Sequence, residues 1–170
     1  MRVTLETDRL ILRPFRLDDA NDMFHGWASD DEVTKYVTWY THENIETTKK
    51  VLSLWVEQYE KTERINFAIT IKDTKELIGG IDVVGYLAGI PVIGYVSGRK
   101  HRGNGYMTEA CKKVIEFLQS LGHNKIIIEA IDENIGSNKV IVKSGGVFVK
   151  SYDDVIKNNN VVINSYIIEK

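Results

Sequence analysis

Apolar residues in the first half of the chain follow two different periods. They recur every three or four positions over residues 20–27 and again over Glu43–Lys61, which predicts two amphipathic helices after a short first strand at Leu10–Leu12. From Ile65 the period changes to two. Three strands joined by short turns are therefore expected as an antiparallel meander, at Ile65–Ile71, Leu77–Tyr86 and Val92–Val96.

The second half of the chain returns to the helical period. Its clearest helix has an apolar stripe from Met107 to Leu121, and Gly122 is suited to a left-handed C-terminal cap. Three consecutive isoleucines indicate that the strand Lys125–Ile131 is buried on both faces. The remaining predicted elements are a short helix and two strands that pair across a loop containing residues 158–160: Ser137–Lys143, Val147–Tyr152 and Val161–Glu169.

The predicted element order is β α α β β β α β α β β. Early antiparallel strands and a later strand–helix–strand crossover are typical of an α+β domain on a mixed sheet, with helices on both faces. The chain has 170 residues, a length that usually forms one core. Because no Pro-, Ser- or Gly-rich stretch resembles a linker, we expect a single domain over residues 1–170.

Composition excludes several classes of partner. Lys and Arg number 22 against 24 Asp and Glu, so the chain lacks the positive charge that nucleic acid or an acidic membrane would attract. No apolar run is long enough to span a membrane, and the only cysteine, Cys111, lies on a buried helical stripe. The four histidines lack metal-ligand spacing. We expect a soluble, cytoplasmic protein, monomeric or homodimeric, that uses no metal.

A basic segment containing two glycines precedes the clearest helix. Backbone N–H groups and the positive end of the helix dipole converge at such a point, which favours a bound phosphate. A plain turn before a helix would use two glycines in the same way. Thr108 and Asn104 do not fit the dinucleotide and P-loop patterns. The expected phosphate contacts are Arg99, Lys100, Arg102, Gly103, Asn104, Gly105, Tyr106 and Met107.

Three ordered motifs resemble one known family. Arg102–Ala110 resembles the acetyl-CoA pyrophosphate loop of the GNAT N-acetyltransferases, whose pattern is Gln/Arg-x-x-Gly-x-Gly/Ala. Leu5–Phe15 is similar to the opening of the branch that contains the ribosomal-protein N-terminal acetyltransferases. Asn134-x-x-Ser137 and Lys143–Phe148 resemble its late elements. The resemblance extends from about residue 4 to residue 169.

The resemblance implies a GNAT-like fold and acetyl-CoA as co-substrate. Its sheet would have seven strands, splayed between the fourth and the fifth, with about four helices. Backbone groups near Tyr95 and Val96 would pair with the pantetheine arm and polarise the thioester carbonyl. Gly94 either marks the bulge that the family has in this strand or is a site of close packing. Further cofactor contacts are implied for Asn134, Ser137 and Lys139.

The reaction implied by the resemblance is direct attack of a primary amine on the thioester in a ternary complex. Ser137 stands at the family position for the acid that protonates the thiolate, because Ile141 replaces the tyrosine of many relatives. Ser137 is alternatively only the N-cap of its helix. Asn134 would hold the cofactor arm or a water, or only shape the turn. The expected catalytic residues are therefore Ser137, Asn134 and Tyr95.

The general base is not evident, since Val92 stands where family members often have a glutamate. Asp82, Glu129 and Glu43 are candidates, and each is alternatively a structural or solvated carboxylate. An α-amine acceptor, with an ordinary pKa of about 7.7–8.0, needs less help than a lysine amine.

The acceptor is expected to be a protein N-terminus or a small-molecule amine, bound by Trp39, Tyr40 and Asp82, while Trp27 belongs to the core. Two other functions remain open. A chain without the glutamate would also suit a catalytically silent acyl-CoA-binding module, and the glycine-bearing loop alone would suit a nucleotide-binding protein.

Overall fold

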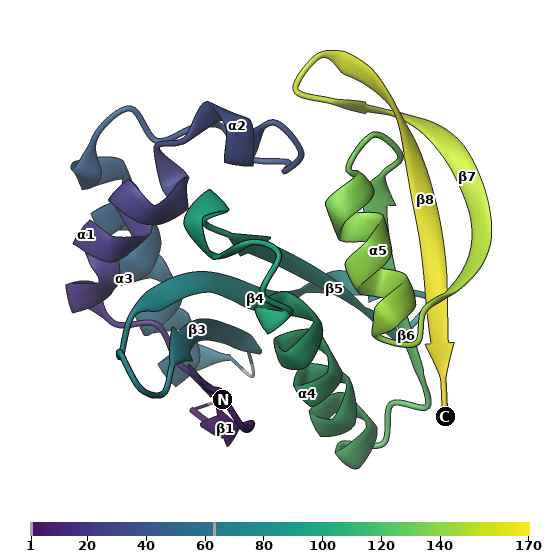
Figure 1. Cartoon of the computed structure of the whole chain (residues 1–170), viewed down its shortest axis with the longest axis horizontal. Coiled ribbons are helices and arrows are strands. Elements are labelled where there is room, and N and C mark those ends of the chain that lie inside the picture. The colour runs from purple at the N-terminus through teal and green to yellow at the C-terminus, as the bar shows by residue number, and fades with distance from the viewer. Residues whose placement is uncertain (1, 63) are drawn as a thin grey trace.

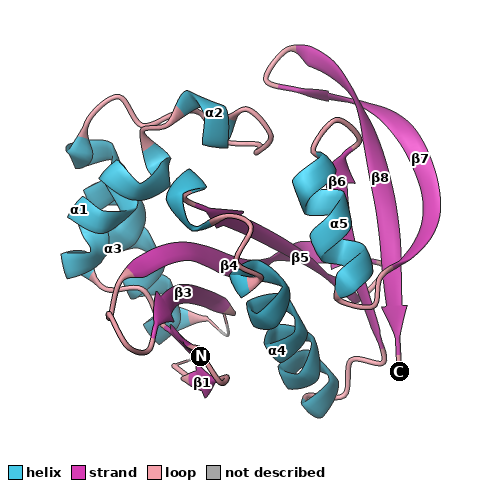
Figure 2. Ribbon diagram, viewed as in Figure 1, coloured by secondary structure: helices cyan, strands magenta, loops and turns pink. Residues whose placement is uncertain are grey.

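The computed structural model describes residues 2–62 and 64–170, which fold around one mixed sheet (Figures 1 and 2). The sheet has eight strands in the order β1-β2-β3-β4-β5-β6-β8-β7, and only β5 and β6 pair in parallel. The α+β class is thus confirmed. The strand missing from the prediction is β1, whose two residues are too few to show a period. The strands are β1 (Leu5–Glu6), β2 (Leu10–Arg13), β3 (Asn66–Ile71), β4 (Leu77–Leu87), β5 (Ile90–Ser97), β6 (Lys125–Ile131), β7 (Val147–Ile156) and β8 (Asn159–Glu169).

Helices cover both faces of the sheet. α4 (Tyr106–Ser120) and α5 (Ile135–Lys143) pack on one face over the larger core, which includes the fully buried Cys111. α1 (Ala20–Met23), α2 (Asp31–Thr34) and α3 (Ile45–Lys61) lie on the other face, over a smaller core around Trp27 (Figure 2). Within the described residues, none of the helices has the length and apolar character that a membrane span requires.

The first predicted helix is divided into three short pieces. A 3₁₀ turn at Leu17–Asp19 leads into α1, and a π-helical turn at Phe24–Ala28 follows it. The π turn closes with a hydrogen bond from the Ser29 amide to the Phe24 carbonyl oxygen. Four apolar positions at helical spacing fit an α-helix and a wider turn equally, so the sequence did not reveal this irregularity.

The hairpin of β7 and β8 is longer than predicted. Its strands extend to Ile156 and from Asn159, so the expected loop over residues 158–160 is a two-residue turn instead. Lys157 and Asn158 both have positive φ, 50° and 64°, as the tight hairpin turn with two left-handed residues requires. The longer hairpin reaches over the top of the molecule towards α2 (Figure 1).

The sheet opens between β5 and β6, as the family resemblance implies. Only Val92 and Ile93 pair with β6, opposite Ile127 and Ile128. Beyond this pair the two strands separate, so the β6-facing edge of β5 from Gly94 to Ser97 has no strand partner in the described sheet.

The bulge lies on β4 and not at Gly94. The pairing of β4 with β5 shifts by one residue at Val84. A Cβ atom added at Gly94 would lie 2.6 Å from Cγ1 of Val84, so that one of the two would have to shift. Gly94 therefore serves the close approach of the two strands, the second of the two sequence interpretations.

Candidate active site

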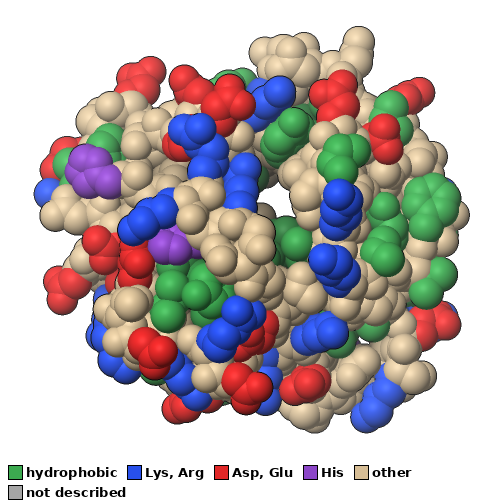
Figure 3. All heavy atoms as spheres, viewed as in Figure 1, with side chains coloured by type: hydrophobic (Ala, Val, Ile, Leu, Met, Phe, Trp, Pro, Cys, Tyr) green, Lys and Arg blue, Asp and Glu red, His purple; other side chains and the backbone are tan. Residues whose placement is uncertain are grey.

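A cavity of about 1260 Å³ passes through the opening of the sheet. Its walls come from the splayed strands β5 and β6, from the segment before α4, from α5, and from the loop after α2. Figure 3 shows the molecule hollowed between its two halves, with Lys and Arg side chains around the opening. The basic residues that line it include Arg102, Lys139 and Lys143.

The glycine-bearing segment forms one end of this cavity. Gly103 and Gly105 have φ values of 79° and 78°, a left-handed conformation that favours glycine, and Gly105 is the N-cap of α4. Gly103, Gly105, Tyr106 and Met107 line the cavity, whereas Asn104 is exposed outside the lining. The first-turn amides of α4 therefore lie at the cavity, as an anion site requires.

The other predicted phosphate contacts divide into two groups. Val96 and Lys139 line the cavity together with Arg102. Arg99 and Lys100 lie outside the lining, where Arg99 Nε pairs with Asp30 at 2.7 Å and Lys100 Nζ with Glu76 at 2.8 Å. Their role as phosphate ligands stays a prediction, and it would require them to exchange these partners.

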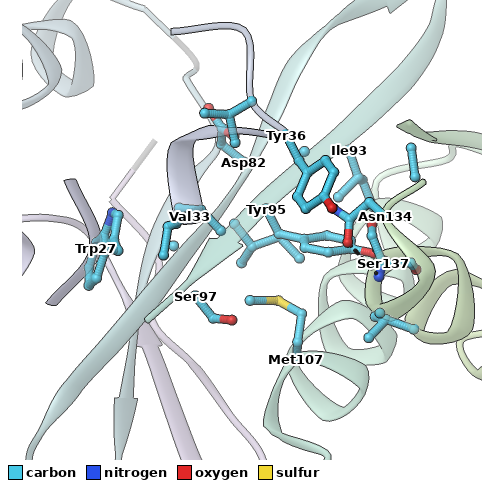
Figure 4. Close-up of a pocket in the computed structure, with 18 of the residues that line it drawn as sticks. Trp27, Val33, Tyr36, Asp82, Ile93, Tyr95, Ser97, Met107, Asn134 and Ser137 are labelled. Carbon is cyan, nitrogen blue, oxygen red and sulfur yellow. Dashed lines mark hydrogen bonds between the residues drawn. The ribbon is translucent and has the colours of Figure 1, made fainter. Parts of the chain in front are cut away.

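A pair of hydroxyl groups connects β5 with α5 across the opening of the sheet. Tyr95 extends from β5 across the opening, and its hydroxyl lies 2.9 Å from Oγ of Ser137 on α5 and 3.1 Å from the Ser137 carbonyl oxygen (Figure 4). Burial raises the pKa of Tyr95 strongly, so the phenol keeps its proton at neutral pH and remains a donor. The position of the missing family tyrosine, Ile141, is fully buried in the core.

Asn134 and not Ser137 caps α5. The Asn134 side-chain oxygen accepts a hydrogen bond of 3.2 Å from the Ser137 amide. Ser137 is therefore the third residue of α5 and not its cap. The interpretation of Ser137 as a cap is therefore wrong, and its hydroxyl is available for another role. Of the alternatives for Asn134, the structure shows the shaping of the turn.

Asp82 lies on β4, directly opposite Gly94 of β5. Residues directly opposite each other project from the same face of a sheet, and so do alternate residues of one strand. Asp82 therefore shares a face with Val92, which stands where family members often have a glutamate. Burial raises the pKa of the Asp82 carboxyl to about 6, although the Arg64 guanidinium, at 3.2 Å, opposes this shift. A carboxylate with this pKa is suited to accept a proton near neutral pH.

The two other candidate bases differ in position. Glu129 lines the cavity from β6 and accepts a hydrogen bond of 3.0 Å from the Tyr152 hydroxyl, a partner that the sequence did not suggest. Glu43 is exposed and lies outside the cavity lining. Burial and the bond to Glu129 raise the pKa of Tyr152 to about 12, so this phenol also stays protonated.

The loop after α2 supplies another wall of the cavity. Trp39 and His42 line the cavity, with ring centroids 5.4 Å apart, and the His42 Nδ1 lies 2.7 Å from Thr48 Oγ1. Tyr40 is 68% exposed and lies outside the lining. Trp27 is buried as predicted, and its ring also lines the cavity (Figure 4).

A lysine that sequence reasoning missed joins the two sides of the cavity. Lys157, at the tip of the β7–β8 hairpin, donates hydrogen bonds of 2.5 Å to the Thr34 carbonyl oxygen and 3.3 Å to that of Trp39. Burial lowers its pKa, opposed by the charge of Asp31. The described residues contain no group of three or more His, Cys, Asp or Glu placed to hold a metal ion.

A sheet opened beside a glycine-capped helix, with basic side chains on the rim, is suited to an extended ligand that bears phosphate groups. Residues 9–147 match the family model described as an acetyltransferase (GNAT) domain. The chain is also 33% identical over 134 residues to the uncharacterized N-acetyltransferase p20 of Bacillus licheniformis, covering 77% of this chain and 75% of that protein. The chain therefore belongs to the GNAT acetyltransferase family.

Solved structures agree with this assignment at the level of the fold. The putative ribosomal-protein-serine acetyltransferase of Vibrio cholerae has a TM-score of 0.85 at 17% identity, covering 99% of this chain and 98% of that one. The microcin C7 self-immunity acetyltransferase MccE, solved in complex with acetyl-CoA and AMP, has a TM-score of 0.82 at 17% identity, covering 96% and 94%. These neighbours include the branch that the sequence motifs indicate.

Proposed function

We propose that the protein transfers the acetyl group of acetyl-CoA to a primary amine, either a protein N-terminal α-amine or the amine of a small molecule. The observation that carries the proposal is the opening between β5 and β6, which a single cavity crosses from the α4 N-terminus to Asp82. This arrangement would give a diphosphate, a thioester and an amine separate places around one opening. The family and the acetyl-CoA complex of MccE support the choice of donor.

The donor would enter with its diphosphate at the first-turn amides of α4. Arg102, Lys139 and Lys143 would neutralise its charge from the rim. The unpaired edge of β5 near Val96 would take the pantetheine amides as an added strand and direct an N–H group at the thioester carbonyl oxygen.

The chemical step would be direct. The uncharged amine nitrogen attacks the thioester carbon, the new C–N bond forms, and the C–S bond breaks as the electron pair leaves with sulfur. Asp82 takes the proton that the amine loses, and the thiolate takes a proton from the Tyr95–Ser137 hydroxyl pair. The pair then regains a proton from solvent while Asp82 releases its own to solvent, which returns the site to its starting state. Cys111 takes no part, because burial in the core raises the pKa of its thiol to about 11.

Release of CoA thiol from acetyl-CoA tests this proposal across peptides, polyamines, amino acids and aminoglycosides. We expect acceptor-dependent thiol release with at least one of these classes, and no release from the Gly105→Val variant, whose branched side chain would force the left-handed N-cap out of its conformation. Tight CoA binding with no turnover on any amine would instead favour the silent acyl-CoA-binding module. Stabilisation by ATP and not by CoA in a thermal-shift assay would favour a nucleotide-binding protein.

A further inference from the structure

The opening motif of the chain lies directly against the first turn of α4. Thr7 and Arg9 belong to the tight turn between β1 and β2, about 100 residues before Glu109. One Glu109 oxygen accepts hydrogen bonds from the Thr7 hydroxyl at 2.5 Å and the Arg9 amide at 2.9 Å, and the other accepts from Arg9 Nε at 2.7 Å. The motif therefore has a specific partner that its sequence position does not suggest.

Arg9 also contacts the glycine-bearing segment. Its Nη1 donates a hydrogen bond of 3.0 Å to the Asn104 carbonyl oxygen, and its guanidinium carbon lies 4.6 Å from the centroid of the Tyr106 ring. A Cβ atom added at Gly105 would lie 3.4 Å from the other terminal nitrogen of Arg9. One side chain thus contacts Asn104 and Tyr106 and lies beside the Gly105 between them.

Glu109 presents an electrostatic problem for an anion site. It stands in the first turn of α4, beside the amides that would receive a diphosphate, where a free carboxylate would repel that ligand. Burial alone would raise its pKa, but the bonds from Thr7 and Arg9 lower it below the ordinary value, so the group is ionised and paired. The ion pair with Arg9 therefore neutralises the negative charge in the first turn of α4.

We infer that Arg9 is a positioning residue for the acyl carrier: it fixes the backbone of residues 104–106 from behind and neutralises Glu109, so that the α4 amides are free to bind a diphosphate. The inference rests on the proposed function. Arg9 would not touch the donor, because its contacts are with Glu109, Asn104 and Tyr106. Its effect should depend on whether the donor carries a diphosphate.

Two donors separate this role from a general effect on the fold. Acetyl-CoA carries the diphosphate, whereas S-acetylpantetheine carries the same thioester without it. We expect Arg9→Met to raise KM for acetyl-CoA about 10-fold with kcat within about 2-fold, and to leave kcat/KM for S-acetylpantetheine unchanged. Arg2→Met is the matched control, since Arg2 forms an exposed ion pair with Glu60 away from α4, and both donors should behave as with wild type.

A second variant tests the neutralisation. Because Arg9→Met removes the positive charge that neutralises Glu109, adding Glu109→Gln should recover part of the lost affinity for CoA in calorimetry, which simple loss of packing would not allow. The positioning role would be overturned if Arg9→Met lowered kcat/KM equally with both donors, or if its KM for acetyl-CoA equalled that of Arg2→Met. The proposed function would stand in either case. A wild-type protein that neither binds CoA nor releases thiol would overturn the proposed function, and the positioning role with it.

Discussion

The hydroxyl groups of Tyr95 and Ser137 lie 2.9 Å apart and connect β5 with α5 across the opening of the sheet. The phenol stays protonated because burial raises its pKa, and its second contact, 3.1 Å from the Ser137 carbonyl oxygen, suits it to donate there. In the proposed mechanism, Ser137 would then direct its own proton towards the departing thiolate.

Removal of the serine hydroxyl should slow the chemical step. We expect Ser137→Ala to lower kcat about 10-fold or more with the CoA dissociation constant nearly unchanged, since the proton is needed chiefly as charge develops on sulfur. Tyr95→Phe should act in the same direction, and the double variant should lose less than the product of the two effects, because both hydroxyls serve one proton transfer. Independent effects that multiply would contradict a shared role. Steady-state kinetics and calorimetry with CoA measure these values.

The cap of α5 gives a separate prediction for stability. Asn134→Ala removes the oxygen that accepts the Ser137 amide, so its free energy of unfolding in urea should fall by about 1 kcal/mol. Ser137→Ala should change that free energy by less than about 0.5 kcal/mol, because its hydroxyl does not cap the helix. The opposite order of the two variants would restore the interpretation of Ser137 as the cap.

Most of the fold was predictable because its elements carry strong periods. The stripe of α4, the isoleucine run of β6 and the alternating apolar residues of β3 are local patterns, and the three elements lie where these patterns predict them. Their burial differs from the prediction, because residues of both parities are buried in β3 and Ile127 of β6 is only half-buried. The features that the sequence did not reveal depend on pairing with another segment of the chain or on the backbone conformation of a turn. β1 exists through its pairing with β2, and the extent of the β7–β8 hairpin depends on two left-handed residues, Lys157 and Asn158, that carry no glycine signal.

The candidate site was predictable only in part, for the same reason. The glycines before α4 and the Asn134-x-x-Ser137 motif are short, local patterns. The pairing of Arg9 with Glu109 and the bonds from Lys157 to the loop after α2 join residues about 100 or more positions apart. No spacing rule connects such residues. The raised pKa of Asp82 likewise follows from burial, which depends on the complete fold.

The acidity of Asp82 predicts a pH profile. If this carboxylate is the base, kcat/KM should rise as pH increases through about 6, where Asp82 loses its proton, and should rise again towards the pKa of the acceptor amine. Asp82→Asn should lack the first rise, so that its rate follows the amine alone. A rise near pH 6 that persists in Asp82→Asn would move the role to another carboxylate, with Glu129→Gln as the next variant to measure.

The same shift predicts how stability depends on pH. The pKa of Asp82 is raised from an ordinary 3.8 to about 6, so between these values the folded protein holds a proton that the unfolded chain has lost. The free energy of unfolding should therefore fall as pH rises from about 4 to about 6. The contribution of Asp82 to this free energy is largest below that range of pH. Urea denaturation of Asp82→Asn should lack this decrease. Equal pH dependence in both proteins would show that the carboxyl is not shifted by folding.

Lys157 predicts a selective effect on the acceptor. Its bonds to the carbonyl oxygens of Thr34 and Trp39 hold the β7–β8 hairpin against the loop after α2, which would form the acceptor-side wall. The residues proposed to bind the donor have no part in this contact. Lys157→Met keeps most of the side-chain length but loses both bonds, so KM for the acceptor should change about 5-fold while KM for acetyl-CoA stays constant. Lys49→Met is the control, because Lys49 is exposed on α3 and pairs only with Glu46 among the described residues. Equal changes in both KM values would mean that the hairpin contact supports the whole cavity and not the acceptor wall alone.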